Sequence, residues 1–436
     1  MIHSLSPYRH HRGLPMWENL DAVTNREPVA RHPRDLFGPK TLRVAVVVGT
    51  RPEAIKMAPV IRTLKARPHQ FEPIVVSTGQ HREMLDQVFA LFDLTPDIDL
   101  GLMKPNQSLN DFSARAFAAL SQTWAELKPD VVLVQGDTAT VTIAGLSAFY
   151  AGIQVGHIEA GLRSFDRYNP FPEEVNRKVA SAVADYHFAP TAQAADNLRA
   201  ERVDADEIYL TGNTIVDALQ TVDLSAGFRS PGLEGKDFTG KQMIFVTSHR
   251  RENHGTPLRN ICRAIRRIIR QSPHAEVVYP VHLNPNVRSV VEHELRLCER
   301  VHLIDPVPYD DLLRLLDQST LILTDSGGIQ EEAPSFNTPL LILRETTERP
   351  EVVECGAGKL VGTDTDRIVQ ESLRLLHDTA YYHSMQEVEN PFGDGQAARR
   401  IADTLHECYS MQEAKRTRKT PAAVPAALLS GLSRAS

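Results

Sequence analysis

Short apolar runs rich in β-branched residues alternate with helical patterns along most of this chain, and this alternation limits the possible folds more than any other feature. Leu42–Val48 is the first such run, and a helical pattern over Glu53–Lys65 follows it. Pro52 directly precedes this pattern and suits the first turn of a helix. Strands that alternate with helices favour a parallel sheet, since each helix returns the chain to the starting edge. The sequence therefore predicts an α/β fold.

The alternation forms two series, and the 436 residues exceed the length of one usual domain. We predict two doubly wound Rossmann-like domains that face each other across a cleft, over residues 41–208 and 209–390. The strands expected in the first domain are Leu42–Val48, Phe71–Ser77, Val131–Gln135, Ile153–Ile158 and Tyr186–Ala189. Those expected in the second are Met243–Thr247, Glu276–Pro280, Val301–Ile304, Leu321–Thr324 and Leu340–Leu343.

The two ends of the chain differ from this pattern. Residues 1–40 show no sustained periodicity, and residues 415–436 are basic and then rich in Ala and Pro. We expect both to be disordered. A final helical pattern over residues 396–409 has no strand after it, so we expect this helix to pack back on the first domain.

Composition excludes several classes of protein. The formal net charge of -7 argues against a nucleic-acid partner. No apolar run is long enough to cross a bilayer, so membrane insertion is not expected. Cys262, Cys298, Cys355 and Cys408 are scattered without a CxxC pair, which fits neither a disulfide framework nor a zinc site. These features favour a cytoplasmic protein.

Three acidic residues follow strands or begin a helix at one predicted sheet edge. Asp137 comes after Val131–Gln135, Glu159 comes after Ile153–Ile158, and Glu173 lies in the first turn of a predicted helix. Ligands of open α/β sheets bind beyond the carboxyl ends of the strands. We therefore predict acid/base chemistry on a neutral, polyhydroxylated substrate. The alternatives are a helix N-cap for Asp137 and an ordinary first-turn acid for Glu173, whereas Glu159 has no obvious helix to serve.

A phosphate site is predicted where the strand Leu321–Thr324 runs into Ser326, Gly327 and Gly328 and a helix begins. Two glycines let a phosphate approach the backbone, and free N–H groups at a helix start favour an anion. Glu332, about one turn further, could accept hydrogen bonds from ribose hydroxyl groups. The alternative is an ordinary N-cap at Ser326.

Basic side chains and histidines follow other strand ends. Arg51 and Lys56 come after the first strand and could clamp a diphosphate, although both could equally be surface charges. His249 follows a strand of the second series and could bond a leaving phosphate or move a proton, the alternative being a loop histidine with satisfied hydrogen bonds. His282 is a weaker candidate of the same kind.

Two motifs are missing from the sequence. No GxGxxG follows a strand, and no GxxxxGK[ST] is present. Both a nicotinamide-dependent redox reaction and an ATP-driven reaction are therefore disfavoured.

A set of motifs in collinear order over about Leu42–Tyr409 resembles the non-hydrolysing UDP-N-acetylglucosamine 2-epimerase family. The motifs are GTRPEAIKMAPVI, TGQHREMLDQVF, GDTATV, HIEAGLRSFDRYNPFPEEVNR, TGNTIVDAL, HRREN, YPVHLNPNVR and LTDSGGIQEEAP. The resemblance implies a glycosyltransferase-B-like fold, a homodimer, and an enzyme without cofactor or metal. It also implies interconversion of UDP-GlcNAc and UDP-ManNAc, which supplies ManNAc units for surface polysaccharide.

The resemblance further implies a mechanism and site roles. UDP is eliminated to leave 2-acetamidoglucal and then adds back, while a proton returns to the opposite face of C2. The implied catalytic residues are Asp137, Glu159, Glu173 and His249. The positions that match UDP-binding residues of the family are Arg51, Lys56, Ser326, Gly327, Gly328 and Glu332. The positions that match a second, activating UDP-GlcNAc site are Gln80, Gln107, Arg250 and His282.

Some features depart from the family pattern. Ala139 and Val141 interrupt a run after the GD motif that is commonly Thr-rich, although Asp137 is kept. Relatives that act on modified UDP-sugars leave the substituents at C3 and C6 open. A glycosyltransferase of the same architecture would need one general base rather than three carboxylates, and a UDP-sugar sensor would need none. The epimerase reaction therefore agrees best with the residues.

Overall fold

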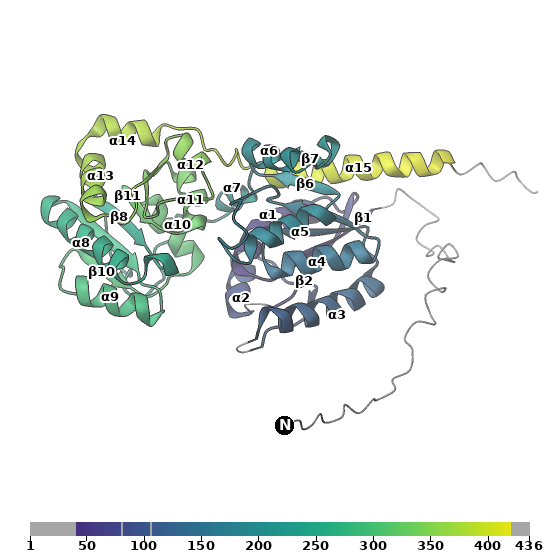
Figure 1. Ribbon diagram of the computed structural model, residues 1–436, viewed down its shortest axis with the longest axis horizontal. Helices are drawn as coiled ribbons and strands as arrows, with labels where there is room; N and C mark the ends of the chain where they lie inside the picture. The colour runs from purple at the N-terminus through teal and green to yellow at the C-terminus, as the bar shows by residue number, and fades with distance from the viewer. Residues whose placement is uncertain (1–40, 80–81, 105–106, 420–436) are drawn as a thin grey trace, which may run out of the picture. The chain divides into compact units, whose positions relative to one another are not determined.

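The computed structural model describes residues 41–79, 82–104 and 107–419, so the expected N-terminal extension lies outside the described residues. The described chain forms two all-parallel sheets (Figure 1). The first has the order β3-β2-β1-β4-β5-β6-β7 and the second the order β10-β9-β8-β11-β12-β13. The predicted fold of two doubly wound α/β units is confirmed.

The strands of the first sheet are β1 (Leu42–Val48), β2 (Phe71–Ser77), β3 (Ile98–Asp99), β4 (Val131–Gln135), β5 (Gln154–Ile158), β6 (Tyr186–Ala189) and β7 (Ile208–Leu210). Those of the second are β8 (Gln242–Thr247), β9 (Ala275–Pro280), β10 (Val301–Ile304), β11 (Leu321–Thr324), β12 (Leu340–Ile342) and β13 (Gly358–Leu360). The central strands are buried on both faces, which explains why they are continuous apolar runs.

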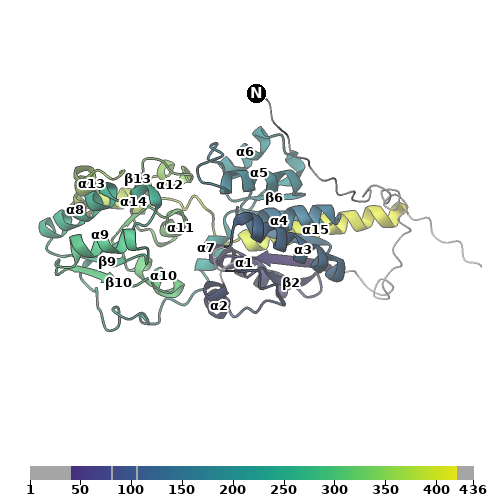
Figure 2. The same ribbon diagram turned by 60° about the horizontal axis from the view of Figure 1, so that its bottom comes forward.

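The helices that follow the strands of the first sheet are α1 (Arg51–Lys65), α2 (Arg82–Leu91), α3 (Leu109–Leu127), α4 (Ala139–Tyr150), α5 (Glu173–Val183) and α6 (Ala192–Ala200). The later helices are α7 (Thr214–Leu219), α8 (Thr256–Gln271), α9 (Pro285–Leu295), α10 (Tyr309–Asp317), α11 (Gly327–Glu332), α12 (Glu351–Glu354), α13 (Thr365–His377), α14 (Thr379–Gln386) and α15 (Ala397–Lys419). Figure 2 shows the same elements turned by 60°.

The boundary predicted after residue 208 falls inside β7, because Ile208–Leu210 pairs with β6 in the first sheet. The next helix, α7, packs against α1. Its Asp217 carboxylate accepts the backbone N–H groups of Ala397 and Ala398, at 3.2 and 2.9 Å, at the start of α15. The first α/β unit therefore includes the chain beyond residue 208, as far as α7.

The last helix extends further than expected. α15 runs to Lys419, so residues 415–419, expected to begin a disordered tail, are helical, and residues 420–436 lie outside the described residues. The helix lies against the first unit (yellow in Figure 1). There Asp403 pairs with Arg67 at 2.5 Å, and the His406 ring packs edge-on against Phe71.

Candidate active site

A cavity of about 1020 Å³ lies at the carboxyl ends of both sheets and contains most of the candidate residues. Those that line it are Arg51, Lys56, Asp137, Glu159, Glu173, His249, Arg250, His282, Ser326, Gly327, Gly328 and Glu332. Gln107 lies outside this lining, on the loop before α3, where Arg115 donates a hydrogen bond to its side-chain oxygen. Gln80 lies outside the described residues.

Strand register explains why distant residues meet here. In the first sheet, Gln135 of β4 is level with Ile158 of β5, so the loops that carry Asp137 and Glu159 begin side by side. In the second sheet, Thr324 of β11 is level with Thr247 of β8, which brings Asp325 beside the His249 loop. The His249 backbone N–H donates to the Asp325 carboxylate at 2.9 Å.

Asp137 does not cap a helix, so the structural alternative for this residue is wrong. The N-cap of α4 is Thr138, whose hydroxyl accepts the Val141 N–H at 3.4 Å. The Asp137 carboxylate is partly exposed to the cavity and accepts a hydrogen bond from Arg177 at 2.6 Å. Arg177 is itself held by Glu174, at 2.8 Å.

Glu159 is almost fully buried and sits in a left-handed backbone conformation with φ of 65°, which is costly for a residue with a Cβ. Its carboxylate forms an ion pair with Lys56 and accepts a hydrogen bond from the Gln135 amide at 3.0 Å. Burial raises the pKa of the Glu159 carboxyl, and Lys56 offsets only part of that shift.

Lys56 is also paired with Glu331, at 2.7 Å, and Glu331 is paired with Arg349 at 2.6 Å. Burial alone would lower the pKa of Lys56, but Glu159 and Glu331 raise it above its usual value. Lys56 belongs to α1 of the first unit, whereas Glu331 and Arg349 belong to the second. The four charges therefore form a buried network that joins the two units.

Glu173 begins α5, as expected, and is half-buried in the cavity wall. Its Oε2 atom is buried and has no hydrogen-bond partner in the described chain. Burial raises the pKa of the Glu173 carboxyl, and the nearby Asp137 charge adds to this. A half-buried acid whose buried oxygen has no partner in the described chain is suited to proton exchange with a ligand.

His249 lies with its ring stacked on His282, at a centroid distance of 5.3 Å. The Nδ1 atom is within 3.4 Å of the Thr247 hydroxyl. Burial lowers the pKa of His249 below its usual value, while Asp325 opposes this. The imidazole is therefore neutral near neutral pH and can donate one N–H to a ligand.

The Ser326-Gly327-Gly328 turn begins α11, and the Ser326 side chain makes no capping hydrogen bond. A Cβ on Gly327 would lie 2.7 Å from a guanidinium nitrogen of Arg349, so the glycine leaves room for that cation. Glu332, the last residue of α11, accepts a hydrogen bond from the Tyr309 hydroxyl at 2.9 Å. Burial raises the pKa of Glu332 to about 7.

Several residues of this cavity were missed from the sequence. Glu53, Arg177, Glu331 and Arg349 all line the cavity. Glu53 accepts hydrogen bonds from the Thr50 N–H at 3.1 Å and from the Thr138 hydroxyl at 2.5 Å. The first three stand within the recognised motifs and could have been singled out there, but nothing in the sequence around Arg349 signals its position.

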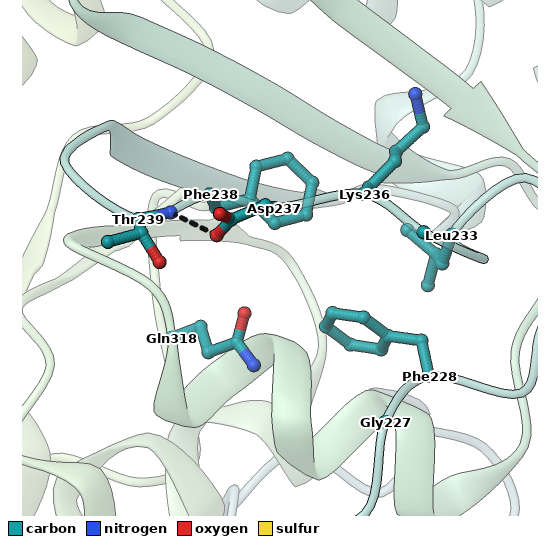
Figure 3. A pocket seen from close by; sticks show the side chains of 9 residues that line it. Gly227, Phe228, Leu233, Lys236, Asp237, Phe238, Thr239 and Gln318 are labelled. Atoms are coloured by element: carbon teal, nitrogen blue, oxygen red, sulfur yellow. Dashed lines mark hydrogen bonds between the residues drawn. The ribbon is translucent and has the colours of Figure 1, made fainter.

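A second cavity, of about 530 Å³, is lined by residues between Gly227 and Thr239 and by Gln318 (Figure 3). Its wall is formed by Phe228, Phe238 and polar side chains, and the Thr239 N–H donates to Asp237 at 2.8 Å. It contains none of the candidate residues. In the described part of the chain, no helix is long and apolar enough to cross a membrane.

Known proteins resemble this chain over most of its length. A family model described as UDP-N-acetylglucosamine 2-epimerase matches residues 62–406. The UDP-N-acetylglucosamine 2-epimerase of Bacillus subtilis is 50% identical over 368 residues, which are 84% of this chain and 95% of the relative. The Escherichia coli K12 enzyme of the same name is 49% identical over 370 residues, 84% of this chain and 98% of the relative.

Solved structures give the same result. The UDP-GlcNAc 2-epimerase from Neisseria meningitidis, bound to UDP-GlcNAc, superimposes with a TM-score of 0.78 at 44% identity, covering 84% of this chain and 100% of that chain. The glycotransferase of kitacinnamycin, at 14% identity and a TM-score of 0.58, shares the fold alone and covers 85% of this chain and 99% of its own. The glycosyltransferase-B-like fold is confirmed. The chain belongs to the UDP-N-acetylglucosamine 2-epimerase family and is an isomerase.

Proposed function

We propose that the protein interconverts UDP-GlcNAc and UDP-ManNAc without releasing free sugar. The observation that carries this proposal is one cavity in which Asp137, Glu159 and Glu173 face the Ser326–Gly328 turn and His249. The Neisseria relative was crystallised with UDP-GlcNAc, which supports the choice of substrate.

The reaction needs acid/base groups because C2 of the sugar carries a proton that no carbonyl activates. Breaking the C1–O bond gives C1 oxocarbenium character and acidifies that proton. A carboxylate removes it, the C2–H electron pair becomes the C1–C2 double bond, and UDP leaves with the electron pair of the C1–O bond. A UDP oxygen then adds back to C1 of 2-acetamidoglucal, while a carboxyl group delivers a proton to the other face of C2.

The electrostatics of the cavity suit these two proton transfers. The raised pKa values of Glu159 and Glu173 bring both carboxyl groups closer to the working pH, where each can both accept and release a proton. Asp137 is held by Arg177 and is the third carboxylate available to C2. Because two faces of C2 must be served, a single general base is insufficient.

UDP must stay bound between the two steps. We assign its diphosphate to the N–H groups of Ser326, Gly327 and Gly328 together with the side chains of Arg51, Lys56 and His249. Glu332 is assigned to the ribose hydroxyl groups. A neutral His249 can donate a hydrogen bond to the leaving diphosphate without adding a charge.

The remaining proposals concern the assembly and control of the enzyme. We propose a cytoplasmic homodimer that supplies ManNAc units for surface polysaccharide, and activation by a second UDP-GlcNAc beside the active site. Arg250 and His282 support the second site, because both line the same cavity as the catalytic residues. Gln80 and Gln107 remain candidates for it by resemblance.

Proton NMR of UDP-GlcNAc with the purified protein in D2O tests the reaction. We expect a UDP-ManNAc signal to grow with deuterium at C2. Net accumulation of free ManNAc and UDP would instead identify a hydrolysing enzyme. Binding without any spectral change would contradict the proposed substrate and point to a modified sugar or a sensor.

A further inference from the structure

We propose that Glu331 is a positioning residue that shares Lys56 with Glu159 and thereby holds the Glu159 carboxylate ready to exchange a proton with C2. This inference rests on the proposed epimerase reaction. Glu331 stands beside Glu332 in the sequence, but its side chain makes different contacts. It is 1% exposed and faces Lys56 and Arg349, whereas Glu332 faces Tyr309.

The geometry makes Lys56 a bridge. Its ammonium group lies between Glu159 of the loop after β5 and Glu331 of α11, and all three side chains are less than one-tenth exposed. Glu331 has a second cation, Arg349, at 2.6 Å. Among the residues that the structure describes, Glu159 has one cation in direct contact, Lys56, and the neutral Gln135 amide at 3.0 Å. The positive charge is therefore divided unequally between the two carboxylates.

The unequal division has a chemical consequence. Burial would raise the pKa of both carboxyl groups, but Arg349 and Lys56 together hold that of Glu331 below its usual value, so Glu331 is ionised. The pKa of Glu159 remains raised, because burial dominates and Glu331 repels the Glu159 charge, against the attraction of Lys56 and Arg349. Glu331 therefore opposes the effect of Lys56 on the pKa of Glu159, so the Glu159 carboxyl can still take up a proton.

The network also depends on both α/β units. Lys56 and Glu159 belong to the first unit, and Glu331 and Arg349 to the second. A buried ion pair that loses one partner leaves an uncompensated charge, which is strongly unfavourable. The pKa of Glu159 therefore depends on the contact between Lys56 of α1 and Glu331 of α11. Proton transfer is in this way linked to the contact between the two units that form the cavity.

Two variants with opposite expected shifts test the inference. Glu331→Gln keeps the shape but removes a charge that raises the pKa of Glu159, so the limb of the kcat/KM profile that Glu159 controls should move to lower pH. Lys56→Met removes the ammonium group, so the same limb should move to higher pH. Profiles are measured from about pH 5 to about pH 9. We expect kcat of Glu331→Gln to fall at least about tenfold.

Glu354→Gln on α12 is the matched control, since it removes one exposed carboxylate from the same unit and should leave the profile unchanged. Calorimetry with UDP separates positioning from binding: Glu331→Gln should keep the Kd of UDP within about twofold. An unchanged kcat and pH profile, or a loss confined to UDP affinity, would overturn the inference.

A carbon NMR titration gives a readout that needs no turnover. The carboxyl resonance that disappears in Glu159→Gln identifies Glu159, and its midpoint should fall in Glu331→Gln and rise in Lys56→Met. Absence of turnover in the unmodified enzyme would reject the proposed function. Midpoints that do not move would reject the role of Glu331, whether or not the enzyme epimerises UDP-GlcNAc.

Discussion

Glu53 shows how burial changes an acid that contacts Thr138, the residue after Asp137. Its carboxylate accepts hydrogen bonds from the Gly49 and Thr50 N–H groups and from the Thr138 hydroxyl. Burial nevertheless raises its pKa from 4.5 to about 7. Between these two values the folded protein binds a proton that the unfolded chain does not, so this residue lowers stability as pH rises through that window.

Glu53→Gln should remove this dependence. The amide oxygen can still accept the two backbone N–H groups, and the amide nitrogen can donate to Thr138. Relative to the unmodified protein, the variant should therefore gain on the order of 3 kcal/mol in the free energy of unfolding between about pH 4.5 and pH 7. Chemical denaturation across this range measures it, with Glu126→Gln on the exposed face of α3 as control. A stability difference that stays constant with pH would contradict the assignment.

That Asp137, Glu159 and Glu173 lie in one cavity could be predicted from the sequence, because the position of each follows from its own element. Asp137 and Glu159 come after strands that are level in the sheet, and Glu173 begins a helix. The charges around them could not be predicted in this way. The pairing of Lys56 with Glu331 depends on how two separate units meet, and neither periodicity nor turn chemistry in one segment specifies that contact.

At the scale of elements, the segment between Ser164 and Pro172 forms part of the cavity wall, and the Glu174 side chain binds its first residues. Tyr168 and Phe171 line the cavity. The buried Glu174 carboxylate accepts the Ser164 and Phe165 N–H groups at 2.9 and 3.2 Å. Its bonds to Arg177 connect this segment to Asp137, so the wall and the carboxylate are positioned together.

Glu174→Gln should therefore impair catalysis as well as stability. The amide cannot hold Arg177 through two charged hydrogen bonds, so Asp137 loses its orientation, and we expect kcat to fall about tenfold. KM should rise because the wall segment loosens. Steady-state kinetics, normalised to the amount of folded enzyme, measures kcat and KM. Lys178→Ala on the exposed face of α5 is the control. A lower Tm with normal kcat and KM would show that Glu174 serves folding alone.

The two glycines of the Ser326–Gly328 turn should respond differently to an added methyl group. A Cβ on Gly327 would meet Arg349 at 2.7 Å, whereas the nearest atom to a Cβ on Gly328 is the Ser326 hydroxyl at 3.9 Å. Overpacking costs about 1–3 kcal/mol, so Gly327→Ala should destabilise the ligand-free protein by that amount. Gly328→Ala in the same short helix should be neutral or gain up to about 1 kcal/mol.

Thermal unfolding without ligand compares the two variants directly. Equal losses of stability in both would show that backbone conformation, rather than the room needed by Arg349, requires glycine here.

Most strands could be predicted from their pattern, whereas the edge strands β3 and β13 could not. β1, β2, β4 and β6 have the expected bounds; β4 and β6 are buried throughout, and β1 and β2 are partly exposed only at Arg43 and at residues 72–74. β3 and β13 were not predicted. They have 2 and 3 residues at the edges of their sheets, too few to show a period. What makes them strands is pairing with β2 and β12, a tertiary contact.

At the scale of the molecule, the chain crosses between the α/β units twice, and both crossings lie side by side. The Asn213 N–H donates to the Phe392 carbonyl oxygen at 2.8 Å, and Asp217 holds the start of α15. α15 then packs on α1 and α7. Because α1 also carries Lys56, the last helix supports the element that forms the ion pair with Glu331 of the second unit.

The packing of α15 can be tested with two residues on opposite sides of the helix. Leu405 is 1% exposed and belongs to the core cluster that includes β1 and α1, whereas Met411 is 62% exposed. Leu405→Ala removes buried methyl groups and leaves a cavity, so it should cost about 2–5 kcal/mol in the free energy of unfolding. Met411→Ala should stay within about 0.5 kcal/mol of the unmodified protein.

Denaturant unfolding followed by tryptophan fluorescence reports on the first unit, because Trp124 of α3 is buried there. Since α15 supports α1, Leu405→Ala should lower the midpoint of this transition, and UDP should restore part of the loss by binding only the folded form. A normal transition in Leu405→Ala would mean that α15 is dispensable for the first unit. Lys56 and Glu331 would then keep their contact without support from the end of the chain.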